Sequence, residues 1–354
     1  MKAYIIAYSI SGGEIAYRLV QGLNKAGYDA TGYLYEKYSS KALVSFQSAE
    51  NIVAQAFSEK SLLIFVCAMG IAVRKIAPFI ESKYTDSAVV VIDDAGRYAI
   101  PVLSGHMGGA NDMAWLCGKI IDAKPVITTA TDIHHKFAVD NFAKENQLYL
   151  SDGRIAKEIS AALLHGETTG LYVDRSCCNV IMEDEEKLKN QGIVNVVSVE
   201  DSPYTYNIAV TPFEGNRENT EYLVPRQITI GVGCRKGVSC TEVETAVNTV
   251  MKEYKIACQA VKQICSIDIK AREEGLIEFC KEKEIPFYTF SAQELLSVEG
   301  SKASSEFVKE ITGVDNVCER SALAGSKGRL IVPKQVVGRV TVAVAIEKAD
   351  VRIV

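Results

Sequence analysis

Three short blocks of the chain combine glycines with groups that do chemistry. They are Cys67-Ala-Met-Gly-Ile-Ala-Val-Arg-Lys75, Ser104-Gly-His-Met-Gly-Gly-Ala-Asn-Asp112 and Gly231-Val-Gly-Cys-Arg-Lys-Gly237. Each follows an apolar run typical of a buried strand and precedes a helical pattern. In open α/β sheets, ligands bind at such strand-to-helix turns, where glycines let a ligand approach the backbone. Because helix N-termini attract anions, the blocks predict sites for a negatively charged ligand.

The second block has the residue types of acid–base catalysis. The imidazole of His106 suits a general acid or base near neutral pH, and Asp112 is placed to orient it or to carry a second proton. The amides of Gly108 and Gly109 would hold an oxyanion. We assign two further residues of the block, Ser104 and Asn111, to substrate binding. The alternative is a tight strand–turn–helix link in which the imidazole caps the backbone.

Cations accompany the other blocks and fit the recognition of carboxylate or phosphate groups. A fourth segment, Cys318 to Lys327, places an acid, hydroxyls and cations in an expected loop before a strand, and its Glu319 is a second candidate proton carrier. Solvated turns are the alternative for all these segments. The predicted substrate-binding residues outside the second block are Gly70, Arg74, Lys75, Gly233, Arg235, Lys236, Arg320, Ser321 and Lys327.

Two other kinds of site are disfavoured. The glycine blocks complete neither a dinucleotide fingerprint nor a phosphate-binding loop, so a nucleotide-dependent enzyme is a weak alternative. The chain has four histidines, and the adjacent pair His134 and His135 would point in different directions, so we predict no metal site.

Composition limits the class of protein. The chain has 354 residues, 48% of them hydrophobic, and a formal net charge of -5, which favours a globular protein and argues against nucleic acid as a partner. The ten cysteines are scattered without a C-x-x-C pair, as reduced core thiols are. We find no targeting segment and no apolar run long enough to span a membrane, so we expect a cytoplasmic protein without a membrane partner.

Strand and helix patterns alternate along the chain, which predicts an α/β fold with mostly parallel, doubly wound sheets. Predicted strands include 2–9, 62–67, 88–93, 98–103 and 340–346, and predicted helices include 110–121 and the segments that follow three capping boxes, Ser11 to Glu14, Ser239 to Glu242 and Ser291 to Glu294. We predict three α/β domains. The first, 1–123, holds the Gly-His-x-Gly-Gly loop, the smaller second spans 124–225, and the third, 226–354, holds the Gly-x-Gly-Cys-Arg-Lys-Gly loop.

Taken together and in this order, the blocks resemble the cobalt-precorrin-5A hydrolase family of anaerobic cobalamin biosynthesis. The resemblance rests on Gly70-Ile-Ala-Val-Arg74, Gly105-His-x-Gly-Gly-Ala-Asn-Asp112, Val126-Ile-Thr-Thr-Ala-Thr-Asp132, Gly231-x-Gly-Cys-Arg-Lys-Gly237, Cys318-x-x-Ser-Ala322 and Val332-Pro-Lys334. It covers nearly the whole chain, except for residues 177–224.

The resemblance implies a reaction in which water opens the δ-lactone of a cobalt-bearing contracted tetrapyrrole. The extruded ring carbon leaves with its methyl group as acetaldehyde, and the product is cobalt-precorrin-5B. Cobalt arrives with the substrate, so no cofactor is expected, and the partners are the small-molecule cobalt-tetrapyrrole and candidate neighbouring enzymes of the pathway. The alternative is a non-catalytic carrier of a tetrapyrrole intermediate.

Overall fold

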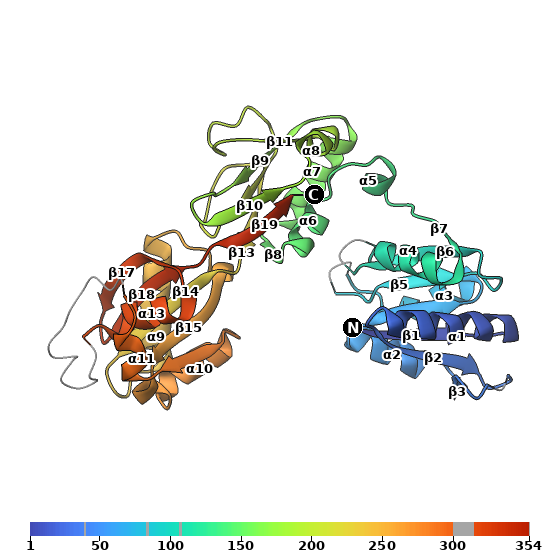
Figure 1. Ribbon diagram of the computed structural model, residues 1–354, viewed down its shortest axis with the longest axis horizontal. Helices are drawn as coiled ribbons and strands as arrows, with labels where there is room; N and C mark the ends of the chain where they lie inside the picture. The colour runs from blue at the N-terminus through green and yellow to red at the C-terminus, as the bar shows by residue number, and fades with distance from the viewer. Residues whose placement is uncertain (39, 83–84, 106–107, 300–314, 354) are drawn as a thin grey trace. The chain divides into compact units, whose positions relative to one another are not determined.

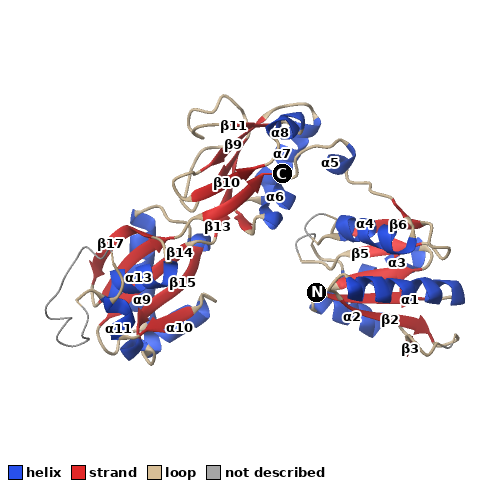
Figure 2. Cartoon of the chain, in the orientation of Figure 1, coloured by secondary structure: helices blue, strands red, loops and turns tan. Residues whose placement is uncertain are grey.

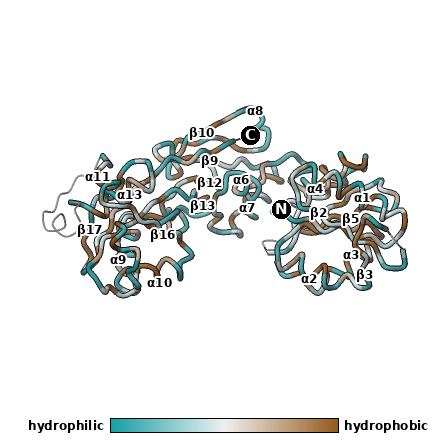
Figure 3. The backbone as a smooth tube through the Cα atoms, turned by 60° about the horizontal axis from the view of Figure 1, so that its bottom comes forward, coloured by the Kyte–Doolittle hydropathy of each residue, from teal (hydrophilic) through white to brown (hydrophobic). Residues whose placement is uncertain are grey.

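The computed structural model describes residues 1–38, 40–82, 85–105, 108–299 and 315–353. This part of the chain forms two compact units, Met1–His135 and Lys136–Val354 (Figure 1). The predicted division into three domains, with boundaries after residues 123 and 225, stays a prediction. Figure 2 shows helices and strands alternating within each unit, and Figure 3 shows hydrophobic stretches of chain in both.

The first unit alternates strands and helices. Its strands are β1 (Lys2–Ala7), β2 (Asp29–Tyr35), β3 (Val44–Phe46), β4 (Leu62–Val66), β5 (Val89–Ile92), β6 (Tyr98–Leu103) and β7 (Lys124–Pro125). Its helices are α1 (Ile10–Lys25), α2 (Glu50–Ser58), α3 (Met69–Ile76), the 3-10 turn η1 (Ala77–Phe79), α4 (Ala110–Ile121) and α5 (Ala130–Ile133). The bounds of β6 and α4 are those that the sequence predicts.

Within the described residues these strands form one sheet in the order β3-β2-β1-β4-β5-β6-β7. Its strands β1 to β5 are parallel, whereas β6 runs antiparallel to β5. Apolar side chains of α1 and α4 pack on one face, and those of α2 and α3 pack on the other. This confirms the doubly wound α/β class, and it explains why β4 is buried at every residue.

The second unit is larger. Its strands are β8 (Leu148–Leu150), β9 (Thr169–Val173), β10 (Cys178–Met182), β11 (Ile193–Asn195), β12 (Asn207–Val210), β13 (Thr220–Pro225), β14 (Ile228–Cys234), β15 (Val261–Ile267), β16 (Phe287–Phe290), β17 (Arg329–Val337), β18 (Val340–Ile346) and β19 (Ala349–Ile353). Its helices are α6 (Val139–Glu145), α7 (Gly153–Leu164), α8 (Glu185–Asn190), α9 (Cys240–Glu253), α10 (Glu274–Glu282), α11 (Ala292–Leu296) and α13 (Val317–Ser326), with the 3-10 turns η2 (Cys258–Ala260) and η3 (Asp268–Lys270).

The described strands of the second unit form sheets that share a hydrophobic core. One sheet has the order β11-β9-β12-β13-β8, and another has the order β16-β15-β14-β18-β17. The last strand, β19, follows β18 of the second of these sheets along the chain and pairs in parallel with β10 (Figure 1). Residues predicted for the middle and last domains are thereby joined by strand pairing.

The segment from Cys318 to Ser326 is a buried helix, and the prediction of a loop there is wrong. Helix α13 packs directly on β14, where a Cβ atom added to Gly231 would lie 1.8 Å from the carbonyl oxygen of Cys318 and 2.8 Å from Ser321 Oγ. Small residues at this contact bring the helix backbone next to the strand. Sequence periodicity missed the helix because small and polar residues, rather than large apolar ones, form its packed face.

Two of the three predicted capping boxes are confirmed, at Ser239–Glu242 and Ser291–Glu294. The third is wrong, because the N-cap of α1 is Ser9, whose Oγ accepts a hydrogen bond from the amide of Gly12. Ser11 lies in the first turn of the helix and donates instead to the carboxylate of Asp94. A partner far away in the sequence therefore decides where this helix begins.

All ten cysteines lie in the described residues as free thiols, and Cys258 alone among them is exposed. No helix in the described residues has the length and apolar character needed to cross a membrane.

We predict opposite effects for two glycine substitutions. Gly231→Ala should lower the free energy of unfolding by about 3 kcal/mol, because its new methyl group would overlap the backbone of α13. Gly70→Ala should leave it unchanged or raise it by up to about 1 kcal/mol, because alanine favours the helix and only Arg74 Nη1 lies nearby, at 3.3 Å. Urea denaturation followed by circular dichroism measures both, and equal losses would contradict this account of the packing.

Candidate functional site

The carboxyl ends of β1, β4 and β5 lie at one edge of the first sheet. Strands β1 and β4 are also where the strand order reverses, the usual place for a ligand in an open α/β sheet. At this edge Ser9 and Ser11 donate hydrogen bonds to the carboxylate of Asp94, the latter at 2.7 Å. These contacts fasten the turn after β5 to the start of α1. Ser9 and Asp94 were missed by the sequence analysis, which gave no sign that these distant turns meet.

The first predicted block lies at this same edge, where it joins β4 to α3. Gly70 and Arg74 are exposed, and the Arg74 guanidinium donates to the carbonyl oxygen of Gly70 at 3.2 Å. Lys75 pairs with Glu50 at 3.6 Å. Both cations have partners within α2 and α3, and the exposed guanidinium of Arg74 keeps further donors for an anion.

The second predicted block lies at the opposite edge of the same sheet. Because β6 is antiparallel to β5, Leu103 pairs beside Val89, at the amino end of β5. Ser104 confirms the position, since its Oγ donates to the carbonyl oxygen of Asp86 at 3.1 Å. The expectation that every block sits at the ligand-binding carboxyl edge is therefore wrong for this one. The reversal occurs in the turn after β5, which the sequence did not show.

Two glycines of this block meet a local structural demand. Gly109 has a φ of 86° and is the N-cap of α4. A Cβ on Gly108 would lie 2.4 Å from the Cβ of Ser104, which itself has a φ of 54°. Asp112 is exposed in the first turn of α4. His106, the predicted acid or base, lies outside the described residues.

Asn111 connects this block to the segment that follows β7. Its Nδ2 donates to Thr129 Oγ1 at 3.1 Å and to Asp132 Oδ2 at 2.7 Å. The residue is 9% exposed, and its Oδ1 is buried without a hydrogen-bond partner in the described structure. Gly105 makes room for the amide, because a Cβ there would lie 2.8 Å from Oδ1. The block and the Thr129–Asp132 segment are thus one local site, since parallel β6 and β7 end at the same edge.

The third predicted block lies at the carboxyl edge of the last sheet. Gly233 lies close to the side chain of Thr341. The side chains of Arg235 and Lys236 are exposed. Arg339, at the tip of the β17–β18 hairpin, shapes the loop by donating to the Lys236 carbonyl oxygen at 2.8 Å. Glu273 accepts the amide of Gly237 at 2.7 Å. The sequence analysis missed both supporting residues, which only the strand order brings to this loop.

Helix α13 uses its predicted site residues within the fold. Glu319 is fully buried and accepts the amide of Lys334 at 2.8 Å, while fully buried Ser321 donates to the carbonyl oxygens of Cys265 and Cys318. Arg320 donates to Asp315 at 2.8 Å, which lowers the pKa of that carboxyl, and to backbone carbonyls at the end of α11.

The predicted site residues are thus distributed over several edges. Lys327 is the C-cap of α13 and lies beside the amino end of β14, whereas Arg235 lies beyond the carboxyl end of β14. Asp112 belongs to the first unit and Glu319 to the second. The structure therefore joins Ser104, Gly108, Gly109, Asn111 and Asp112 in one loop and helix start of the first unit, whereas Arg235, Lys236 and Lys327 belong to the second unit.

Comparisons with known proteins match both units. Residues 51–132 match the family described as Cobalamin synthesis G N-terminal, and residues 228–345 match Cobalamin synthesis G C-terminus. The cobalt-precorrin-5A hydrolase of Salmonella typhimurium is 32% identical over 307 residues, which is 85% of this chain and 86% of that protein. The hydrolase of the same name from Priestia megaterium is 32% identical over 86% of this chain and 83% of its own length.

The chain belongs to the cobalt-precorrin-5A hydrolase family.

This confirms the resemblance drawn from the sequence blocks, and it makes the chain a hydrolase with a role in cobalamin biosynthesis. Among solved structures, the putative cobalamin biosynthesis protein G homolog from Sulfolobus solfataricus is 24% identical to this hydrolase. The match covers 97% of this chain and 96% of that chain, with a TM-score of 0.39. The two ranges that match the family models contain the contacts of Asn111 with Thr129 and Asp132 in the first unit and the loop that Arg339 supports in the second.

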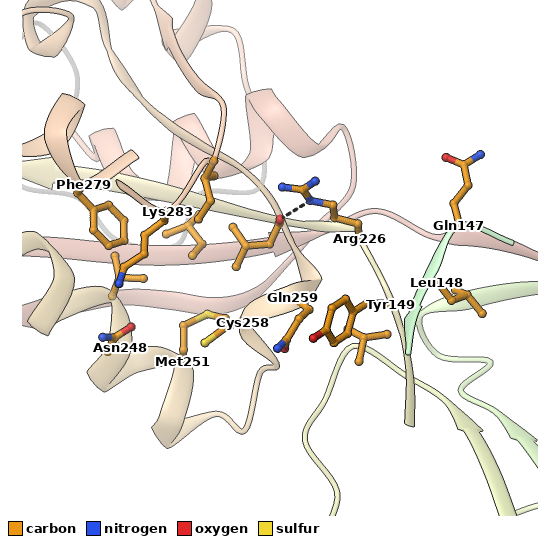
Figure 4. Close-up of a pocket in the computed structure, with 15 residues that line it drawn as sticks. Gln147, Leu148, Tyr149, Arg226, Asn248, Met251, Cys258, Gln259, Phe279 and Lys283 are labelled. Carbon is orange, nitrogen blue, oxygen red and sulfur yellow. Dashed lines mark hydrogen bonds between the residues drawn. The ribbon is translucent and has the colours of Figure 1, made fainter. Parts of the chain in front are cut away.

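Two cavities of the hydrolase lie away from the predicted residues. One, of about 660 Å³, is lined by α1 and by the segment after β2. The other, of about 680 Å³, lies in the second unit between β8, β13, α9 and α10 (Figure 4). Neither is lined by the three glycine blocks. Over the described ranges, no three His, Cys, Asp or Glu side chains gather as a metal site requires.

We predict a pH-dependent cost for Asn111→Asp. It would place a second carboxylate beside Asp132 in a buried site and lower the stability of the first unit by about 2 kcal/mol or more at pH 8. The paired carboxyls would bind a proton more tightly in the folded than in the unfolded chain, so the loss should shrink as the pH falls towards 5. Thermal melts at both pH values measure it.

The matched control adds Asp132→Asn to Asn111→Asp, which removes the like charge. This double variant should recover most of the loss at pH 8. A loss of the same size at both pH values, with no recovery in the double variant, would contradict the contact between Asn111 and Asp132.

Proposed function

We propose that this chain hydrolyses cobalt-precorrin-5A, a cobalt-bearing contracted tetrapyrrole that carries a δ-lactone. The observation that carries the proposal is the 32% identity with the Salmonella typhimurium cobalt-precorrin-5A hydrolase over 85% of the chain. Water opens the lactone, and the extruded ring carbon leaves with its methyl group as acetaldehyde, which yields cobalt-precorrin-5B. The cobalt belongs to the substrate, so the reaction uses no cofactor of the protein.

This chemistry requires an activated water, a stabiliser of the developing oxyanion and a proton donor for the leaving unit. We assign the base or acid role to His106 and the oxyanion to the amides of Gly108 and Gly109. Asp112 would orient the imidazole or carry the second proton. The contacts of Asn111 with Thr129 and Asp132 support this assignment, because they hold the start of α4 in place beside the loop.

Glu319 does not enter the proposed reaction. It is fully buried in the second unit, and its carboxylate accepts a backbone amide. Arg320 and Ser321 are likewise used within the fold. Four exposed cations remain candidates for the carboxylate arms of the substrate, and they are Arg74, Arg235, Lys236 and Lys327.

The expected setting of the reaction is the cytoplasm. The partners are the small-molecule tetrapyrrole and the neighbouring enzymes that supply it and remove the product. Incubation of the purified chain with cobalt-precorrin-5A tests the reaction directly. Acetaldehyde and cobalt-precorrin-5B should form in equal amounts, and a substrate that stays intact would reject the proposal.

We predict that His106→Ala lowers the rate of acetaldehyde release by about 100-fold or more, because the reaction loses its general acid–base group. His165→Ala is the matched control. This exposed histidine ends α7 in the second unit, where its Nδ1 lies 2.8 Å from the Ala161 carbonyl oxygen, and its loss should leave the rate unchanged. Acetaldehyde is measured by coupled reduction with alcohol dehydrogenase, and a wild-type rate for His106→Ala would remove the catalytic assignment.

A further inference from the structure

The cavity of about 680 Å³ in the second unit lies far from the glycine loop of the same sheet. It adjoins the amino ends of β14 and β15, whereas the Gly233–Gly237 loop follows the carboxyl end of β14. Helices α9 and α10 form one side of the cavity, and β8 and β13 of the neighbouring sheet form another. Its volume falls within the range of about 300–1,000 Å³ that is usual for small-molecule sites.

The cavity has an apolar interior, and its lining includes a half-exposed aromatic side chain. Ile230, Met251 and Phe279 line it and are buried against the core of the unit. Tyr149 of β8 also lines it, although 49% of this residue is exposed. Figure 4 shows Tyr149 beside Gln259, with Phe279 and Met251 farther along the cavity. Such a surface can cover the apolar part of a ring system and leave its polar arms at the opening.

The lining of the cavity contains two cations, Arg226 and Lys283, and, among the described residues, no aspartate or glutamate. Lys283 is paired with Glu244 at 2.5 Å, so Arg226 is the lining cation without an acidic partner in the described structure. The Nε of Arg226 donates to the carbonyl oxygen of Val261 at 3.0 Å, as the dashed line in Figure 4 marks. This bond orients the guanidinium, and its terminal nitrogens have no protein partner in the described structure. An oriented guanidinium of this kind suits a carboxylate.

We propose that this cavity binds the tetrapyrrole substrate, with the ring edge against the apolar interior and a carboxylate arm on Arg226. The proposal rests on the proposed function for the class of ligand. An apolar ring with acidic arms matches an apolar cavity that presents the oriented guanidinium of Arg226. The proposed substrate site therefore lies in the second unit.

Cys258 provides a direct measurement of occupancy. It lines the cavity, and among the ten cysteines, all of which lie in the described residues, it is the exposed one. A maleimide should label Cys258 rapidly in the free protein. Saturation with uroporphyrin III, a polycarboxylate tetrapyrrole without a lactone to hydrolyse, should slow this labelling by about tenfold or more. Cys258→Ser identifies the labelled site.

The arginine is tested by Arg226→Gln, which should raise the uroporphyrin concentration needed for half-protection by about tenfold. Arg175→Gln is the matched control, since Arg175 is an exposed arginine of the same unit outside the cavity, and it should leave protection unchanged.

The apolar interior is tested by Asn248→Trp, which adds bulk at an exposed lining position of α9 and should abolish protection. Thr249→Trp adds the same bulk to the next residue of the helix, outside the lining, and should keep it. Circular dichroism melts establish that each variant is folded. If Asn248→Trp unfolds, Arg226→Gln and its control decide.

The acetaldehyde assay separates this proposal from the proposed function. Arg226→Gln should raise the KM for cobalt-precorrin-5A about tenfold and leave kcat unchanged.

If the wild type releases acetaldehyde but Arg226→Gln keeps wild-type KM and protection, the cavity is not the substrate site and the reaction stands. If the wild type releases none but protection still depends on Arg226, the reaction is wrong and the binding site stands. An Arg235→Gln effect on protection without an Arg226→Gln effect would move the site to the other edge of the sheet.

Discussion

The direction of each strand is the constraint on which the arrangement of the loops depends. In the first sheet, β5 and β6 are antiparallel, so the loop after β6 is directed to the edge opposite the loops after β1, β4 and β5. Ser104 to Asp112 therefore meets the segment after β7, and Asn111 bonds to Thr129 and Asp132 there. The Gly70 block instead shares its edge with Ser9 and Asp94. Two edges of one sheet thus carry separate sets of polar groups.

Close backbone packing has a comparable effect in the second unit. Helix α13 approaches β14 so closely that Gly231 can carry no side chain. The cost of burying Glu319 and Ser321 is offset because each makes hydrogen bonds to the backbone. Glu319 and Ser321 are residue types that suit a catalytic loop, but here they stabilise a helix inside the core. The exposed cations Arg235 and Lys236 lie beyond the carboxyl end of β14.

The two units differ in what they offer to a substrate. The first contains the loop with the proposed acid–base group and a buried amide that anchors α4. The second contains a cavity with an apolar interior and the guanidinium of Arg226 in its lining. The loop of the first unit could be predicted from the sequence, because glycines and a histidine in one short segment are a local signal. The cavity could not, because its lining comes from separate segments between Gln147 and Ile285, none of which has an unusual composition.

The sequence by itself determined the class of fold, the bounds of Tyr98–Leu103 and Ala110–Ile121, two capping boxes and the family, because periodicity, caps and motifs depend on neighbours within a few residues. The tertiary structure alone decided which loops share an edge, that Ser9 rather than Ser11 begins α1, and that Ser321 faces the core. These features depend on partners such as Asp94 for Ser9 and β14 for α13, which lie far away along the chain and are brought close only by the order and direction of the strands.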